Sequence, residues 1–271
     1  MKIGCCANMP AKTVNRTEVE LIPLLAESGF DYVELSAVYL SGLSSQDLKR
    51  TEECLRQCGV SCPNINAFFP PQISLVQILP NATAIREYCL DVFEKASRLG
   101  ASAIGFGSGA SRRVDGPVPT SEEEKVFSEQ LFLICSLAAG YGISILLEPL
   151  RYEETNYLNH LAETATLISR LGISNLGLLA DSYHIRATGD AFDALVPLGG
   201  MLRHAHIASQ SRRGFPLPSD PDPFSDFLRA LLCSGYAGNI SVEAFPSDLP
   251  ADAAASSAFL HQTLIEEVRR V

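Results

Sequence analysis

The sequence predicts an α/β fold, a single-domain (β/α)8 TIM barrel that spans residues 1–271. Strand-like and helix-like segments alternate from one end of the chain to the other, without a linker, a repeat block or a low-complexity tract. The length also fits, because barrels of this class typically have about 250 residues and form one domain. A doubly wound open sheet is the alternative, but it would usually need fewer units and a nucleotide-binding fingerprint.

Eight segments have the character of buried strands. Several are continuous runs rich in Ile, Val and Leu, as is typical of parallel strands that are buried on both faces. We expect strands at residues 2–7, 32–37, 62–69, 102–107, 143–150, 176–181, 202–208 and 239–245.

Amphipathic segments separate the expected strands. Their apolar residues recur every three or four positions, which predicts helices with one buried stripe. A glycine that can adopt a left-handed cap stands just after several of these segments. We expect helices at residues 18–28, 85–99, 122–139, 162–171, 224–233 and 251–268.

Composition and charge exclude several classes of protein. The net charge of −10 and the pI of about 5.0 disfavour binding to nucleic acid or to an anionic membrane, because such a surface repels phosphate groups. No apolar run approaches the ~20 residues of a membrane span, and the first residues lack the apolar segment of a signal peptide. We therefore expect a cytoplasmic protein whose eight cysteines are buried thiols rather than disulfides.

Four ligand-type side chains stand at the ends of four successive apolar runs in the second half of the chain. The runs read ILLE, LLAD, HAHI and SVEA, and they supply Glu148, Asp181, His206 and Glu243. Because the active site of a (β/α)8 barrel lies at the carboxyl ends of its strands, these side chains can converge there. Any one of them alone is readily explained as a buried residue that a neighbour satisfies, but the repeated position favours a shared site.

The chemistry of this set indicates a metal centre. A buried carboxylate needs a metal or a hydrogen-bonding partner to offset its desolvation. Two Glu, one Asp and one His make a mostly oxygen ligand set, which favours Mn²⁺, Mg²⁺ or Co²⁺ over structural zinc. We expect one divalent metal ion per chain, with Mn²⁺ as the first choice and Zn²⁺ still open.

Short motifs around these residues resemble a known family. They are Glu-Pro-Leu at residues 148–150, Asp-x-x-His at 181–184, His-x5-Arg at 206–212 and Val-Glu at 242–243. With these motifs the chain resembles the xylose isomerase-like barrel superfamily of sugar isomerases and epimerases. It is most similar to ketose 3-epimerases and hydroxypyruvate isomerase-like proteins. The order of elements matches over the whole chain, and the specific motifs lie in its second half.

The resemblance implies a role for each matched residue. The four ligand-type residues named above would bind the divalent ion. Glu148 and Glu243 would also be catalytic and would exchange the proton of the substrate carbon from opposite sides. His184 and Arg212 would bind a substrate oxygen and stabilise the developing negative charge. Arginine can contribute only charge and hydrogen bonds there, because it has no lone pair for a metal.

The substrate pocket matches less closely than the metal site. Ketose 3-epimerases tend to follow Glu-Pro-Leu with an Asn-Arg-x-Glu pattern, of which Glu154 fits the last position here. Asn66 and Phe68, near the end of the expected third strand, are expected to line the pocket together with Glu34 and Phe106. Ordinary core packing explains an aromatic wall at this place equally well.

Two further features have mundane interpretations. Residues 105–110, GFGSGA, are interpreted as a tight loop after the fourth strand, because the glycine spacing of a dinucleotide fingerprint and the Walker lysine are missing. A contact with a phosphate or carboxylate group is the alternative for this loop. His204 precedes His206 by two residues, so it points to the same side of the strand but one layer deeper. We interpret it as a core residue or a support for the ligands.

The predicted function is a metal-dependent sugar isomerase or epimerase that acts on a ketose or related keto-sugar through proton transfer and a metal-stabilised enediolate. The expected partner is a small-molecule sugar, and a homodimer or homotetramer is left open. A keto-inositol-type dehydratase is an alternative on the same site. An endonuclease IV-like phosphodiesterase would need further histidines where Asn66 and Gly107 stand. A non-catalytic sugar-binding protein is disfavoured, since binding alone does not need two glutamate bases.

Overall fold

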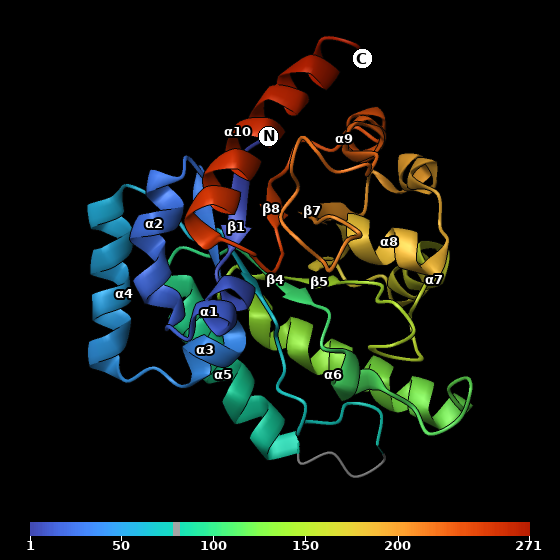
Figure 1. The fold of residues 1–271 in the computed structure, drawn as a ribbon. Coiled ribbons are helices and arrows are strands. Elements are labelled where there is room, and N and C mark those ends of the chain that lie inside the picture. The colour runs from blue at the N-terminus through green and yellow to red at the C-terminus, as the bar shows by residue number, and fades with distance from the viewer. Residues whose placement is uncertain (78–81) are drawn as a thin grey trace.

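The computed structural model describes residues 1–77 and 82–271 and confirms the predicted (β/α)8 barrel. Its parallel strands follow one another in chain order, and β1 pairs with β8 to close the barrel (Figure 1). The strands are β1 (Ile3–Cys6), β2 (Tyr32–Ser36), β3 (Asn64–Asn66), β4 (Ala103–Phe106), β5 (Ser144–Leu147), β6 (Leu176–Asp181), β7 (Leu202–Ile207) and β8 (Ile240–Val242).

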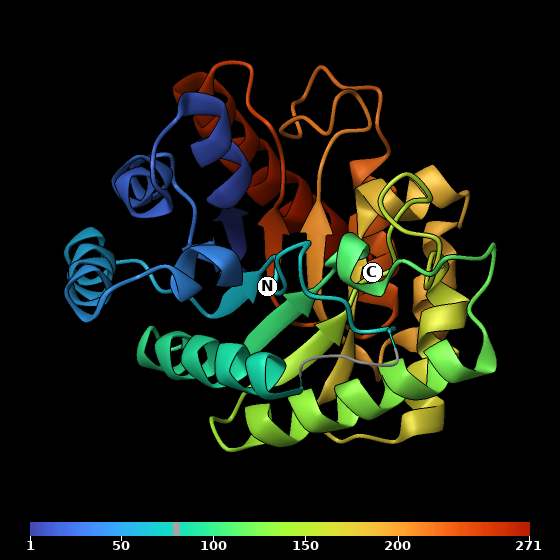
Figure 2. The ribbon, with the colours of Figure 1, turned by 90° about the horizontal axis from the view of Figure 1, so that it is seen from below.

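Helices surround the barrel, and α5 and α6 lie side by side along its outside (Figure 2). The α-helices are α1 (Asn8–Val14), α2 (Ile22–Glu27), α3 (Ala37–Ser41), α4 (Ser45–Cys58), α5 (Ala82–Arg98), α6 (Ser121–Ala139), α7 (Leu161–Leu171), α8 (Ser182–Thr188), α9 (Phe224–Cys233) and α10 (Leu249–Val268). Short 3₁₀ helices are η1 (Glu18–Leu21), η2 (Gly109–Arg112) and η3 (Phe192–Leu198). In the described part of the chain, no helix is both long and apolar enough to cross a membrane.

Local sequence signals explain most helix boundaries. Five of the six predicted helices agree with the structure to within a few residues at each end. The sixth, predicted at residues 18–28, is divided into η1 and α2, because Pro23 lies in the first turn of α2 and favours a new helix start there. Thr120 and Glu123 form a reciprocal capping box that begins α6.

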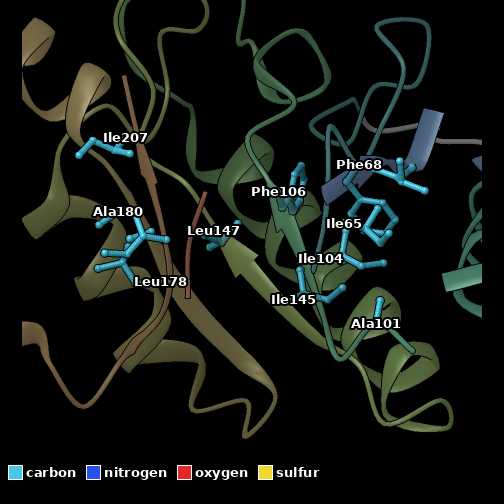
Figure 3. Packing of buried hydrophobic residues seen from close by; sticks show 14 of the residues in the cluster. Ile65, Phe68, Ala101, Ile104, Phe106, Ile145, Leu147, Leu178, Ala180 and Ile207 are labelled. Atoms are coloured by element: carbon cyan, nitrogen blue, oxygen red, sulfur yellow. The ribbon is translucent and has the colours of Figure 1, made fainter. Parts of the chain in front are cut away.

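The main hydrophobic core lies between the barrel and its helices (Figure 3). The outward side chains of Ile65, Ile104, Leu147, Leu178 and Ile207 are fully buried there. Each such side chain contributes about 1.5–3 kcal/mol relative to an exposed one. Because these residues come from neighbouring strands, their packing fixes where the inward side chains of the same strands point.

The interior of the barrel is apolar only in part. Ala103, Leu146 and Leu179 form a small separate cluster, and Gly105 leaves room for it, since a Cβ there would come within 2.9 Å of Leu179 Cδ1. Strand residues alternate between the two faces of the barrel. Nearer the carboxyl ends the inward positions are polar and buried, namely Glu34, Asn66, Asp181, His204, His206 and Ser241.

Candidate metal centre and active site

The four predicted metal ligands meet at the carboxyl end of the barrel. Asp181 ends β6 and His206 lies near the end of β7, while Glu148 and Glu243 directly follow β5 and β8. Each of the four is buried, and one ligand atom from each lies within 4.8 Å of those of the others. His206 Nδ1 is 3.6 Å from Glu148 Oε1 and 3.4 Å from Glu243 Oε2.

Unpaired polar atoms mark this site as fit for a cation. Among the described residues, Glu148 Oε1 and His206 Nδ1 are buried and have no hydrogen-bond partner. A buried polar atom without a partner costs about 1–3 kcal/mol, so such atoms rarely cluster without a reason. Carboxylate oxygens and an imidazole lone pair directed at one point are a donor set that suits a divalent ion.

The two glutamates have opposite pKa shifts. Burial raises the pKa of Glu148 to about 7, and the negative charge of Glu243 acts in the same direction. Burial also opposes ionisation of Glu243, but the positive charges of Arg213 and His206 outweigh it and lower the pKa of Glu243 to about 2. One carboxyl therefore titrates near neutrality in the metal-free protein, while the other stays ionised.

Arg213, rather than the predicted Arg212, lies among these carboxylates. Its Nη2 donates to Asp181 Oδ2 at 2.9 Å and to Glu243 Oε2, and its Nη1 approaches Glu154 Oε1 at 3.5 Å. Arg212 is exposed and lines a different surface cavity, together with Phe215 and Phe245.

The backbone conformation explains why Arg213, and not Arg212, points inward. Arg212 and Arg213 both have left-handed φ angles, 57° and 51°, and the Gly214 N–H donates to Ser211 O. Two successive left-handed residues reverse the chain and turn adjacent side chains apart. Counting residues from His206, as the His-x5-Arg motif does, cannot reveal which of the two arginines points inward.

His184 is oriented as a hydrogen-bond donor to the site. Its Nδ1 accepts from the Arg151 backbone N–H at 3.3 Å, so a neutral ring carries its proton on Nε2. Burial and the charge of Arg213 both lower the pKa of His184 well below its ordinary value. Nε2 lies 3.6 Å from Asp181 Oδ2, has no hydrogen-bond partner within the described residues, and borders the cavity.

The residues at the end of β3 match the sequence-based expectation for the pocket only in part. Asn66 Nδ2 donates to Glu243 Oε1 at 3.0 Å, which ties it to the ligand set. Phe68 does not line the cavity; it is fully buried in an aromatic cluster, and Phe69 lines the cavity instead. Ala67, with a φ angle of 45°, interrupts the strand alternation just before the two phenylalanines and so exchanges their directions.

A cavity of about 400 Å³ opens above the ligands, within the size range of small-molecule sites. Glu148, Glu154, His184, Arg213 and Glu243 are among the residues that line it. The lining also includes Ser108 and Gly109 of the glycine-rich loop, and three residues of α1 that were not predicted, namely Asn8, Met9 and Lys12. The lining residues of α1 carry no motif, so the sequence held no signal for them.

Comparison with known proteins agrees with this architecture. The sequence profile of the xylose isomerase-like TIM barrel family matches residues 22–263. The chain belongs to this family. It is 24% identical over 232 residues to a D-psicose 3-epimerase of Agrobacterium fabrum, covering 83% of this chain and 78% of that protein. It is 25% identical over 239 residues to a putative hydroxypyruvate isomerase of Streptomyces coelicolor, covering 83% and 84%.

The fold similarity extends to solved structures. The structure of a D-psicose 3-epimerase from Clostridium cellulolyticum H10, with D-tagatose, superposes with a TM-score of 0.85 at 19% sequence identity. The superposition covers 97% of this chain and 99% of that one. At this identity the match establishes the shared fold.

Proposed function

We propose that this protein is a divalent-metal-dependent isomerase that epimerises or isomerises a ketose or related keto-sugar. The observation that carries the proposal is the pair of buried carboxylates of Glu148 and Glu243, which border one cavity. Together with Asp181 and His206, they direct ligand atoms to one place. The similarity to ketose 3-epimerases and to a putative hydroxypyruvate isomerase supports the same class of reaction. Mn²⁺ is the ion we expect.

The two glutamates suit the exchange of a proton at carbon. One carboxylate removes the proton next to the substrate carbonyl, and the electron pair of the broken C–H bond moves toward the carbonyl oxygen. The other carboxyl returns a proton to the opposite face, which inverts the configuration.

The remaining residues bind the substrate or hold Glu243 in place. His184 Nε2–H donates a hydrogen bond to a substrate oxygen, and Arg213 keeps Glu243 ionised and in place. Asn66 holds the other oxygen of Glu243. A bound divalent ion would polarise the substrate carbonyl and stabilise negative charge on its oxygens.

The phosphodiesterase alternative finds no support at the neighbouring strands. Asn66 ends β3 and Gly107 follows β4, so neither position supplies a histidine. Among the described residues, the ligand group that borders the cavity draws only on the ends of β5, β6, β7 and β8. The keto-inositol-type dehydratase therefore remains as the one alternative, and its product distinguishes it from an isomerase.

The test is a substrate scan by NMR in D₂O with the metal-loaded protein and a set of ketoses, aldoses and keto-inositols. Solvent deuterium at carbon 3 identifies an epimerase, and deuterium at carbon 1 or 2 identifies an aldose–ketose isomerase. An alkene or deoxy product identifies a dehydratase and contradicts the proposal. Absence of both exchange and turnover over the whole set would also contradict it.

A further inference from the structure

Glu34 is a fully buried carboxylate on β2 that lies beside the ligand group. Its Oε1 is 3.2 Å from His206 Nε2. Its Oε2 is 2.8 Å from His204 Nε2 and accepts a hydrogen bond from Ser241 Oγ at 2.6 Å. Both carboxylate oxygens are therefore occupied by partners from β7 and β8.

We propose that Glu34 is the positioning residue that orients His206 for metal binding through Nδ1. The inference rests on the metal dependence in the proposed function. An ionised carboxylate can only accept hydrogen bonds, so the imidazole nitrogen that faces it must carry a proton. A neutral ring has one proton, and with that proton on Nε2 the lone pair is on Nδ1. That lone pair points toward Glu148 Oε1 and Glu243 Oε2.

The opposite side of the His206 ring offers a rival metal position. Cys6 Sγ lies 3.9 Å from His206 Nε2, and ligand atoms of Cys6, Glu34 and His206 lie within 4.8 Å of one another. A metal there would have to displace the proton on Nε2 and replace its hydrogen bond to Glu34 with metal bonds to both residues. While Glu34 accepts that hydrogen bond, only Nδ1 of His206 is available to a metal.

The surroundings of Glu34 hold the carboxylate in a single orientation. Ser241 Oγ donates to Glu34 and is 2.7 Å from Tyr32 Oη, so the tyrosine hydroxyl donates to it in turn. His204 Nδ1 is buried and has no partner in the described part of the chain, which assigns the His204 proton to Nε2, facing Glu34. Carboxylates that bind the outer N–H of a ligating histidine fix its tautomer and raise its basicity.

The direct test identifies which ring nitrogen of His206 binds metal in the wild-type protein. Histidine labelled with ¹⁵N and titrated with ¹¹³Cd²⁺ gives a cadmium–nitrogen coupling on the nitrogen that binds the ion. We expect this coupling on His206 Nδ1, with the proton retained on Nε2. Coupling to Nε2, or a bound ion without coupling to His206, would overturn the inference. No variant is needed, so folding defects cannot obscure the result.

Two variants test the role of Glu34 itself. Glu34→Gln keeps the size but replaces one acceptor with a donor, and we expect its Cd²⁺ dissociation constant to rise about 10–100-fold. Cys6→Ala is the matched control, because Cys6 also contacts His206 Nε2. This variant should change the Cd²⁺ dissociation constant less than about threefold. Unchanged affinity in Glu34→Gln, or equal losses in both variants, would contradict the proposal. Metal binding as expected without any sugar turnover would refute the proposed function instead and leave this inference standing.

Discussion

Gly107 lies directly against the side chain of Glu148. A Cβ atom at residue 107 would come within 2.5 Å of Glu148 Oε2, a separation that side chains essentially never adopt. The glycine that follows β4 therefore gives the carboxylate at the end of β5 the space it occupies. A loop position without any functional group is in this way part of the active-site geometry.

Gly107→Ala should displace the Glu148 carboxylate and lower kcat/KM by about 10- to 100-fold, because small misplacements of a catalytic group are costly. The matched control is Gly200→Ala, where an added methyl group meets no atom of residues 1–77 or 82–271 within 4 Å. Steady-state kinetics on the substrate found in the NMR scan make the comparison. Equal activity of Gly107→Ala and wild type would show that this contact does not matter.

Glu148→Gln and Glu243→Gln should each abolish turnover and leave the fold intact. Loss of a positioned general base typically lowers the rate by about 10²–10⁴-fold, and more where metal binding is also disturbed. Glu153→Gln is the control, since Glu153 is on the same loop as Glu154 but 71% exposed. Circular dichroism checks folding, and kcat decides. Activity within a few-fold of wild type in either active-site variant would remove that residue from proton transfer.

Neighbouring arginines should behave differently. Arg213→Ala leaves Asp181 and Glu243 without their cation, and we expect kcat/KM to fall by about 10- to 100-fold, the range for hydrogen bonds to charged groups. Arg212→Ala should stay near wild type, because that side chain is exposed and away from the cavity. The reverse ranking would restore Arg212 as the substrate-binding residue.

Metal affinity should depend on pH in the neutral range. The pKa of Glu148 is about 7, and the charge of Glu34 raises the pKa of His206 well above its ordinary value although burial opposes this. Both groups must lose a proton to bind metal, so affinity rises with pH and falls as the pH drops through 7. We expect the dissociation constant for the metal to be at least about tenfold higher at pH 6 than at pH 8, measured by chelator competition. An affinity that is constant between these pH values would contradict the protonation states assigned here.

Strand periodicity explains why the fold and the ligand group were predictable. Buried apolar runs located the strands, and the polar residue at the end of each run pointed to Glu148, Asp181, His206 and Glu243. The structure brings these four together without a change in position. Inward-facing residues within a strand follow the same alternation. Glu34, which contacts the predicted ligand His206, also lies at a buried, inward-facing strand position.

The backbone conformation of the loops explains where the structure differs from the prediction made from the sequence. Ala67, Arg212 and Arg213 have positive φ angles that no periodic pattern encodes, and each difference lies beside one of them. The side chain that enters the site is consequently Arg213 and not Arg212, and the one that lines the cavity is Phe69 and not Phe68. Long-range proximity, such as that between Gly107 and Glu148, has no local signal at all.

The most direct test of the central claim is metal analysis combined with chelation and add-back. The account predicts one divalent ion per chain, loss of sugar turnover after chelation, and recovery on addition of Mn²⁺. The same treatment of Asp181→Ala should yield neither a stoichiometric ion nor recovery, because one of the four ligands is gone. Three zinc ions per chain, or full turnover after complete chelation, would contradict the account.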